Sequence, residues 1–202
     1  MAYSDFKTIR QFEEKFGFQQ RLESLFQKRD LHAVKPSEHL TFDLQEAAEI
    51  ALLNSEKAKS EFIISPILRE LRRRNKTFAF FSGYAFDVDK AQKLTGVCDF
   101  LLSTNVHAVE IKSPVVCLVE AKNRTIEEGF GQCAAEMYAA RLLNERDDEP
   151  YRTIYGCVTT ASEWHFLRLE DNFIIIDRDR YLLSELGILL AIFEKIIQFY
   201  TK

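Results

Sequence analysis

The stretch Pro114-Val-Val-Cys-Leu-Val-Glu120-Ala-Lys122-Asn decides the fold, together with Gly96-Val-Cys-Asp99-Phe-Leu-Leu-Ser about twenty positions earlier. Both are short apolar runs of the kind that form buried strands, and both carry charge at one end. Side chains alternate faces along a strand, so Glu120 and Lys122 point the same way. If the two strands are neighbours, two carboxylates and one ammonium meet at one place. Because a buried charge is costly unless it is paired or binds a metal, the pattern predicts a charged site there.

The composition indicates one buried core with an appendage. Of the 202 residues, 47% are apolar, and 7 glycines and 4 prolines are too few for a collagen-like or disordered chain. The net charge of −4 gives no general attraction for polyanions, so a nucleic-acid partner would need a local basic patch. A basic cluster at the end of a helix has another explanation as well, because the helix dipole favours positive charges near a helix C-terminus. The basic cluster comprises Arg69, Arg72, Arg73, Arg74 and Lys76.

The cysteines and the apolar segments predict a cytoplasmic protein with no membrane partner. No C-x-x-C pair is present, which argues against a zinc cluster and favours reduced core thiols. The N-terminus has no apolar stretch like a signal peptide. The most apolar region, residues 181–200, is interrupted by charges and is too polar to span a bilayer. The widely spaced cysteines are Cys98, Cys117, Cys133 and Cys157.

Hydrophobic periodicity predicts a helical start, strands in the middle and a helical end. We expect one or two amphipathic helices in residues 4–30, and Pro66 to kink or divide a later helix. Thr125-Ile-Glu-Glu128 is a capping box that opens a further helix. The other expected elements are a connector at 35–40, helices at 44–74, 125–144 and 182–200, strands at 77–86 and 153–160, and a hairpin of 164–169 and 173–177.

This order of elements predicts an α/β fold in which a mixed central sheet lies between helical layers. We assign residues 1–40 to an N-terminal helical extension and connector, and residues 41–202 to the main domain. The N-terminal helices are either a surface for forming a homo-oligomer or a lid on the core. The sequence does not choose between these two roles.

The charged residues suit phosphodiester chemistry with a divalent cation. Mg²⁺ prefers hard oxygen ligands and keeps several waters, and Mn²⁺ is a substitute. Asp99 and Glu120 can supply carboxylates, and the carbonyl of Ala121 is a third candidate ligand. Such an ion polarises a phosphoryl oxygen and lowers the pKa of a bound water. Lys122 would orient or deprotonate that water, or neutralise charge that develops on the phosphate.

These residues and three further stretches resemble the PD-(D/E)XK nuclease superfamily. The resemblance covers roughly residues 35–200 and is closest to a branch common in cyanobacteria. It implies a restriction-endonuclease-like core and Mg²⁺-dependent cleavage of phosphodiester bonds, mostly in DNA, without fixing the substrate. The further stretches are Asn54-Ser-Glu56-Lys-Ala-Lys-Ser-Glu61-Phe-Ile-Ile-Ser-Pro-Ile-Leu, Gly131-Gln132-Cys-Ala-Ala-Glu136-Met and Tyr155-Gly-Cys-Val-Thr-Thr-Ala-Ser-Glu-Trp164.

The resemblance assigns a role to each matching position. Asp99 and Glu120 would be metal ligands and Lys122 the catalytic lysine. Superfamily members often add a glutamate from the helix before the first strand; Glu61 fits that position best, and Glu56 competes with it. Gln132 matches a glutamine that helps to fix the lysine and the substrate.

Two positions depart from the superfamily pattern. Cys98 replaces the motif proline, a commonly tolerated change. Where some nucleases carry a functional tyrosine four residues after the glutamine, this chain has Glu136, which argues against that subgroup's end-processing role. A second hypothesis is therefore a non-catalytic member that binds protein or nucleic acid. The acidic balance favours this hypothesis, and the intact Asp, Glu and Lys argue against it.

Overall fold

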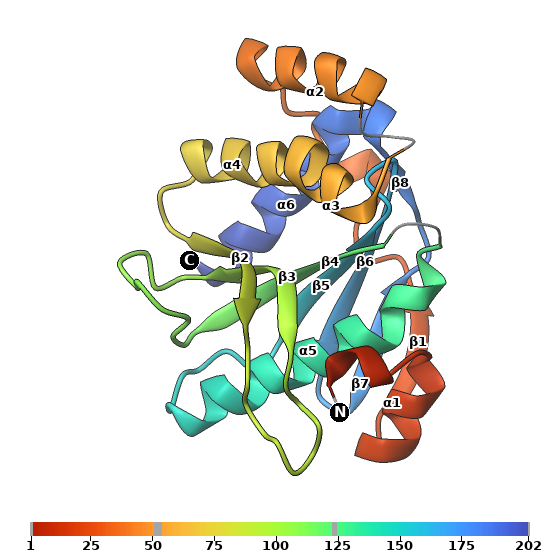
Figure 1. The fold of residues 1–202 in the computed structure, drawn as a ribbon, viewed down its shortest axis with the longest axis vertical. Helices are drawn as coiled ribbons and strands as arrows, with labels where there is room; N and C mark the ends of the chain where they lie inside the picture. Colours follow the sequence, from red (N-terminus) through yellow and green to blue (C-terminus); the bar gives the residue numbers. More distant parts are fainter. Residues whose placement is uncertain (1, 51–53, 123–124, 202) are drawn as a thin grey trace.

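A sheet between two layers of helices makes up the fold (Figure 1). The computed structural model describes residues 2–50, 54–122 and 125–201, and leaves the side chain of Cys117 undescribed. Helices α3, α4 and α6 cover one face of the sheet with α2 beyond them, and α5 covers the other with α1 packed on it. The helices are α1 (Ile9–Phe16), α2 (Glu38–Ile50), α3 (Glu56–Lys59), α4 (Ser65–Arg74), α5 (Glu127–Arg146) and α6 (Leu186–Tyr200).

The sheet is mixed, with the strand order β1-β7-β6-β5-β4-β3-β2 and β8 paired to β6. The pairs β1–β7 and β4–β5 are parallel, and the other pairs are antiparallel. The predicted α/β class, with a mixed sheet flanked by helices, is confirmed. The strands are β1 (Gln19–Glu23), β2 (Ala79–Ala85), β3 (Val97–Ser103), β4 (Val115–Ala121), β5 (Ile154–Thr159), β6 (Glu163–Glu170), β7 (Phe173–Asp177) and β8 (Tyr181–Leu182).

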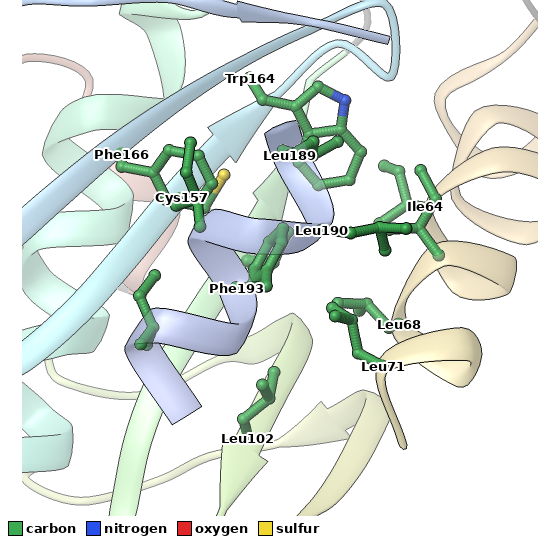
Figure 2. Close-up of a cluster of buried hydrophobic side chains, with 14 of the residues drawn as sticks. Ile64, Leu68, Leu71, Leu102, Cys157, Trp164, Phe166, Leu189, Leu190 and Phe193 are labelled. Atoms are coloured by element: carbon green, nitrogen blue, oxygen red, sulfur yellow. The ribbon is translucent and has the colours of Figure 1, made fainter. Parts of the chain in front are cut away.

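Each face of the sheet carries its own apolar core. On the α4–α6 face, Trp164 of β6 packs edge-on against Phe193 of α6 with ring centroids 5.9 Å apart, and Ile64 and Leu190 lie beside them (Figure 2). On the opposite face, buried small residues let α5 lie close to the sheet. At Gly129, for example, an added Cβ would overlap the side chain of Val158 on β5. The helix α5 therefore packs closely on the sheet at β5.

The N-terminal segment is not wholly helical, and the prediction for residues 4–30 is wrong in this respect. Helix α1 ends at Gly17, whose φ of +74° is the left-handed conformation that closes many helices. Residues Gln19–Glu23 then form β1, parallel to β7. Most of β1 is exposed and shows no alternation of apolar and polar residues, so its local sequence carries no strand signal. The backbone groups of β7, which would otherwise form a bare sheet edge, determine its conformation.

The predicted helix over residues 44–74 also begins earlier than expected. Helix α2 starts at Glu38, inside the predicted connector, because Ser37 caps it by accepting a hydrogen bond from the Leu40 N–H at 3.1 Å. Residues 51–53 of the predicted helix lie outside the described residues.

Pro66 divides this helical region without ending it. The segment Ser60–Ile64 between α3 and α4 is a π-helical turn, in which the Ser65 N–H donates to the Ser60 carbonyl five residues earlier. Pro66 follows in the first turn of α4, where a missing N–H costs nothing. The wide turn and the proline together carry the chain from α3 into α4.

The later elements follow the prediction with changes at their ends. Helix α5 lacks the predicted capping box, because Ile126 occupies the N-cap and makes no side-chain cap bond. The β6–β7 hairpin is present, with Asp171 at a φ of +49° in its turn. Strand β8 delays the closing helix to Leu186. None of the helices within the described ranges combines the length and apolar character that crossing a bilayer requires.

Candidate active site at the ends of β3 and β4

Asp99 and Glu120 lie at the same end of two neighbouring strands. The antiparallel register pairs Phe100 of β3 with Val119 of β4, so Asp99 and Glu120 follow side by side. The Asp99 Oδ2 accepts a hydrogen bond from the Ala121 N–H at 2.8 Å. This bond fixes the Asp99 carboxylate against the end of β4. The two carboxylates that the sequence singled out are thus brought together.

Lys122 joins them just beyond the end of β4. Its backbone N–H donates to the Thr159 carbonyl of β5 at 2.8 Å, which continues the parallel pairing. Its Nζ donates to Glu120 Oε1 at 2.6 Å and to Gln132 Oε1 at 3.0 Å. Burial lowers the pKa of Lys122, but the charge and hydrogen bond of Glu120 outweigh it and raise the pKa. Lys122 is therefore an ammonium at neutral pH in this arrangement.

Glu120 is a buried carboxyl with one oxygen left over. The residue is 2% exposed, and its Oε2 has no hydrogen-bond partner in the described part of the chain. Burial raises its pKa well above the ordinary value, the negative charges of Glu136 and Asp99 add to this, and Lys122 opposes it. Burial also raises the pKa of Asp99, against the hydrogen bond from Ala121 and the charge of Lys122. Burial therefore favours the protonated form of both carboxyls more than the charge of Lys122 offsets.

Gln132 and Glu136 complete the cluster from helix α5. The Gln132 side chain accepts from Lys122 and donates its Nε2–H to Glu136 Oε1 at 3.1 Å. Glu136 is fully buried, and burial raises its pKa to about 8. Sequence reasoning treated position 136 only as a missing tyrosine. The available signal was the spacing, because residues four apart on a helix share a face and Gln132 already pointed to the site.

The structure favours Glu56 over Glu61 as the carboxylate nearest to the cluster. Glu56 lies next to Lys122 in one hollow of about 300 Å³ and next to Asp99 in another of about 270 Å³. Its charge contributes to the raised pKa of both neighbours. Glu61 borders the second hollow, but its side chain is 55% exposed and lies 3.7 Å from the Lys57 ammonium. The sequence favoured Glu61, with Glu56 as the alternative, and the structure favours the alternative.

The N-terminal segment forms one wall of the hollow at Lys122. Phe6 and Lys7 line this hollow together with Gln132. The segment lies tightly on α5, because a Cβ added at Gly131 would come within 2.5 Å of the Phe6 and Thr8 carbonyl oxygens. Of the two roles left open by the sequence, covering the core is therefore observed for these residues.

The basic cluster at the end of α4 is partly committed to structure. Arg74 donates to Glu70 Oε1 at 2.8 Å and to the Lys35 carbonyl at 2.6 Å. Arg73 lies 3.9 Å from the other oxygen of Glu70. These contacts tie α4 to the start of α2, since Glu70 also accepts from the Ser37 N–H and hydroxyl. The predicted alternative of cations at a helix C-terminus accounts for these two arginines.

The donor set fits a divalent cation in its chemistry and its charge. Asp99, Glu120 and the Ala121 carbonyl are oxygen donors, which Mg²⁺ prefers. Three carboxyls, those of Asp99, Glu120 and Glu136, surround one ammonium, and an unpartnered oxygen of Glu120 is available. The described residues contain no group of three or more His, Cys, Asp or Glu side chains placed to hold a metal ion. Water or a phosphate oxygen would therefore have to complete the coordination.

Comparisons with known proteins add no relative to this description. No protein-family model, no curated protein and no solved structure matches the chain. The chemistry of the site is therefore the basis on which a function can be assigned.

Proposed function

We propose that the chain is a Mg²⁺-dependent nuclease that hydrolyses phosphodiester bonds in DNA, on a restriction-endonuclease-like core. One observation supports the proposal most strongly: the Lys122 ammonium lies 2.6 Å from Glu120 Oε1 and 3.0 Å from Gln132 Oε1. The Asp99 carboxylate accepts a hydrogen bond from Ala121 at the same end of β4. This arrangement supplies acidic oxygens for a cation and positive charge for a phosphate at one place. The resemblance of the sequence to PD-(D/E)XK nucleases supports the proposal that the chain is an endonuclease.

Each residue has a separate role in the proposed reaction. Asp99 and Glu120 hold Mg²⁺ or Mn²⁺, with the carbonyl of Ala121 as a further ligand. The bound cation supplies polarisation of a phosphoryl oxygen and a water with a lowered pKa. Lys122, protonated as its raised pKa requires, donates hydrogen bonds to the attacking water or to the charge that develops on the phosphate. Gln132 holds Lys122 in place.

The charge of the protein makes the cation necessary for binding as well. The net charge is −4, and Glu56 and Glu128 line the Lys122 hollow together with Lys7. A DNA phosphate would meet repulsion from these carboxylates until a cation offsets them. DNA affinity should therefore depend on the divalent ion and fall steeply with added salt.

Calorimetry combined with a cleavage assay tests this proposal. Mg²⁺ and Mn²⁺ are titrated into the wild type, Glu120→Gln and the control Glu46→Gln at an exposed position of α2. The same samples receive single-stranded, duplex and branched DNA. We expect metal binding and cleavage in the wild type and the control, and neither in Glu120→Gln. Absence of metal binding by the wild type, with DNA present, would refute the nuclease proposal.

A second candidate function is a non-catalytic binding module on the same core. An apolar hollow of about 770 Å³ between α2 and the β8–α6 segment favours it, with Leu44, Leu182 and Leu186 in its lining. Exposed apolar surface of this kind is typical of interaction sites. A wild-type protein without metal binding or cleavage in the assay above would favour this second function.

A further inference from the structure

Glu136 is the most deeply buried charged group of the site. It is 0% exposed in the middle of α5, between the fully buried Ala135 and Met137. Its Oε1 accepts from Gln132 Nε2 at 3.1 Å, and its Oε2 has no hydrogen-bond partner within the described residues. The Glu120 carboxyl is a second neighbour within hydrogen-bonding reach, so this oxygen is partnered only when one of the two carboxyls carries a proton.

Such a residue is difficult to explain by stability. Replacing a whole buried polar network with apolar side chains of similar volume is often neutral or stabilising, and a network with an unsatisfied member is the costly case. Apart from Gln132, the residues of α5 around Glu136 are small or apolar, including Cys133 and Ala140. Packing alone would therefore favour an apolar residue at position 136.

The hydrogen-bond chain indicates what the carboxyl does instead. A glutamine side chain can present either its oxygen or its NH₂ group to a neighbour. Lys122 has only donors, so it can be held only by the oxygen of Gln132. Glu136 accepts from the NH₂ group at the other side of the same amide, in its charged and in its protonated form. An acceptor at position 136 thus determines which end of the amide faces Lys122.

We propose that Glu136 is a positioning residue, which orients the Gln132 amide so that its oxygen holds the Lys122 ammonium beside Glu120. The inference rests on the proposed nuclease function only where Lys122 is said to act on a phosphodiester. The orientation of Gln132 and Lys122 is a property of the folded protein and can be measured without a substrate.

Two variants separate the acceptor from the charge. Glu136→Gln keeps an acceptor oxygen and removes the charge, whereas Glu136→Met removes both at similar volume. Met137→Leu, at the next buried position of α5, is the control for disturbed packing. Glu136→Gln should raise the Tm by at least about 2 °C, because the buried ionisable group is gone while Gln132 keeps an acceptor. Glu136→Met should raise the Tm less than Glu136→Gln does, because it also leaves the Gln132 NH₂ group without that acceptor.

The reactivity of Lys122 provides the decisive measurement. The acetylation rate of Lys122 is measured by mass spectrometry relative to that of Lys57, whose side chain is 83% exposed. Loss of one net hydrogen bond should make Lys122 about fivefold more reactive in Glu136→Met, because such a bond contributes about 1 kcal/mol. Glu136→Gln and Met137→Leu should leave the rate unchanged.

Three results would overturn the inference. An unchanged acetylation rate in Glu136→Met would mean that Glu136 does not orient the Gln132 amide toward Lys122. An equal increase in Glu136→Gln would mean that the ionisable carboxyl acts on Lys122 by its charge, directly or through Glu120, and not by orienting Gln132. A lower Tm in both Glu136 variants would mean that the residue serves stability. Failure of the nuclease proposal would show separately, as absence of metal-dependent cleavage by the wild type.

Discussion

Glu136→Gln should make the metal-free protein more stable in a way that grows with pH. Burial raises the pKa of Glu136 from its ordinary value of 4.5 to about 8. Between these values the folded protein keeps a proton that the unfolded chain has lost. The free energy of unfolding therefore falls as pH rises through this window, and the loss is complete above pH 8. Glutamine has no proton to lose, so the variant escapes this decline.

The size of the effect follows from the same two values. The window spans about 3.5 pH units, and each unit corresponds to about 1.4 kcal/mol, which sets an upper limit of about 5 kcal/mol. Glu120 lies in the same buried cluster and ionises more easily once its neighbour is neutral. We therefore expect the variant to exceed the wild type by about 2–5 kcal/mol at pH 8 and by less than about 1 kcal/mol near pH 5.

Urea unfolding at pH 5, 6, 7 and 8, with a chelator present, measures this difference. Glu61→Gln is the matched control, because its side chain is largely exposed and the change should stay within about 0.5 kcal/mol at every pH. A difference between Glu136→Gln and the wild type that is constant over this range would refute the reasoning. So would a difference that decreases as pH rises.

Three further predictions concern the chemistry and the packing. Asp99→Ala and Lys122→Ala should each lower metal-dependent DNA cleavage by about 10²–10⁴-fold, measured with fluorescent oligonucleotides, and an unchanged rate in either would contradict the proposed roles. Trp164→Ala should lower the free energy of unfolding by about 3–5 kcal/mol in urea, because the side chain is fully buried against α6; a loss below about 1 kcal/mol would contradict that packing. Gly131→Ala should push the N-terminal segment off α5, costing about 1–3 kcal/mol and speeding proteolysis near Phe6, whereas unchanged proteolysis would argue against the close contact.

Local patterns in the sequence were sufficient for most of the fold. The apolar runs before Glu120 and after Asp99 form the neighbouring strands β4 and β3, and their charged ends meet. The small residues of α5 let that helix approach the sheet closely, as the contact at Gly129 shows. These features depend on residues a few positions apart, so periodicity and residue size reveal them.

Other features of the fold and the site depend on contacts with segments that are distant in the sequence. Residues 19–23 form a strand because β7 offers an edge, and nothing in those five residues requires it. Glu56 is favoured over Glu61 because it alone lines both hollows, beside Lys122 in one and beside Asp99 in the other, and this depends on how α3 packs against β3 and α5. The spacing from Gln132 could have pointed to Glu136, but its burial beside Glu120 became visible only once α5 lay against β4.

By itself, the sequence determined the α/β class, the strand ends that carry charge and the grouping of Asp99, Glu120 and Lys122. Strand alternation and apolar runs are local properties, and they are enough to predict these features. Only the tertiary structure decided that the buried Glu136 reaches Lys122 through Gln132, because α5 and β4 approach each other by packing. Only the tertiary structure showed that the N-terminal segment forms a wall of the same hollow, because its contact with Gly131 joins residues more than a hundred positions apart.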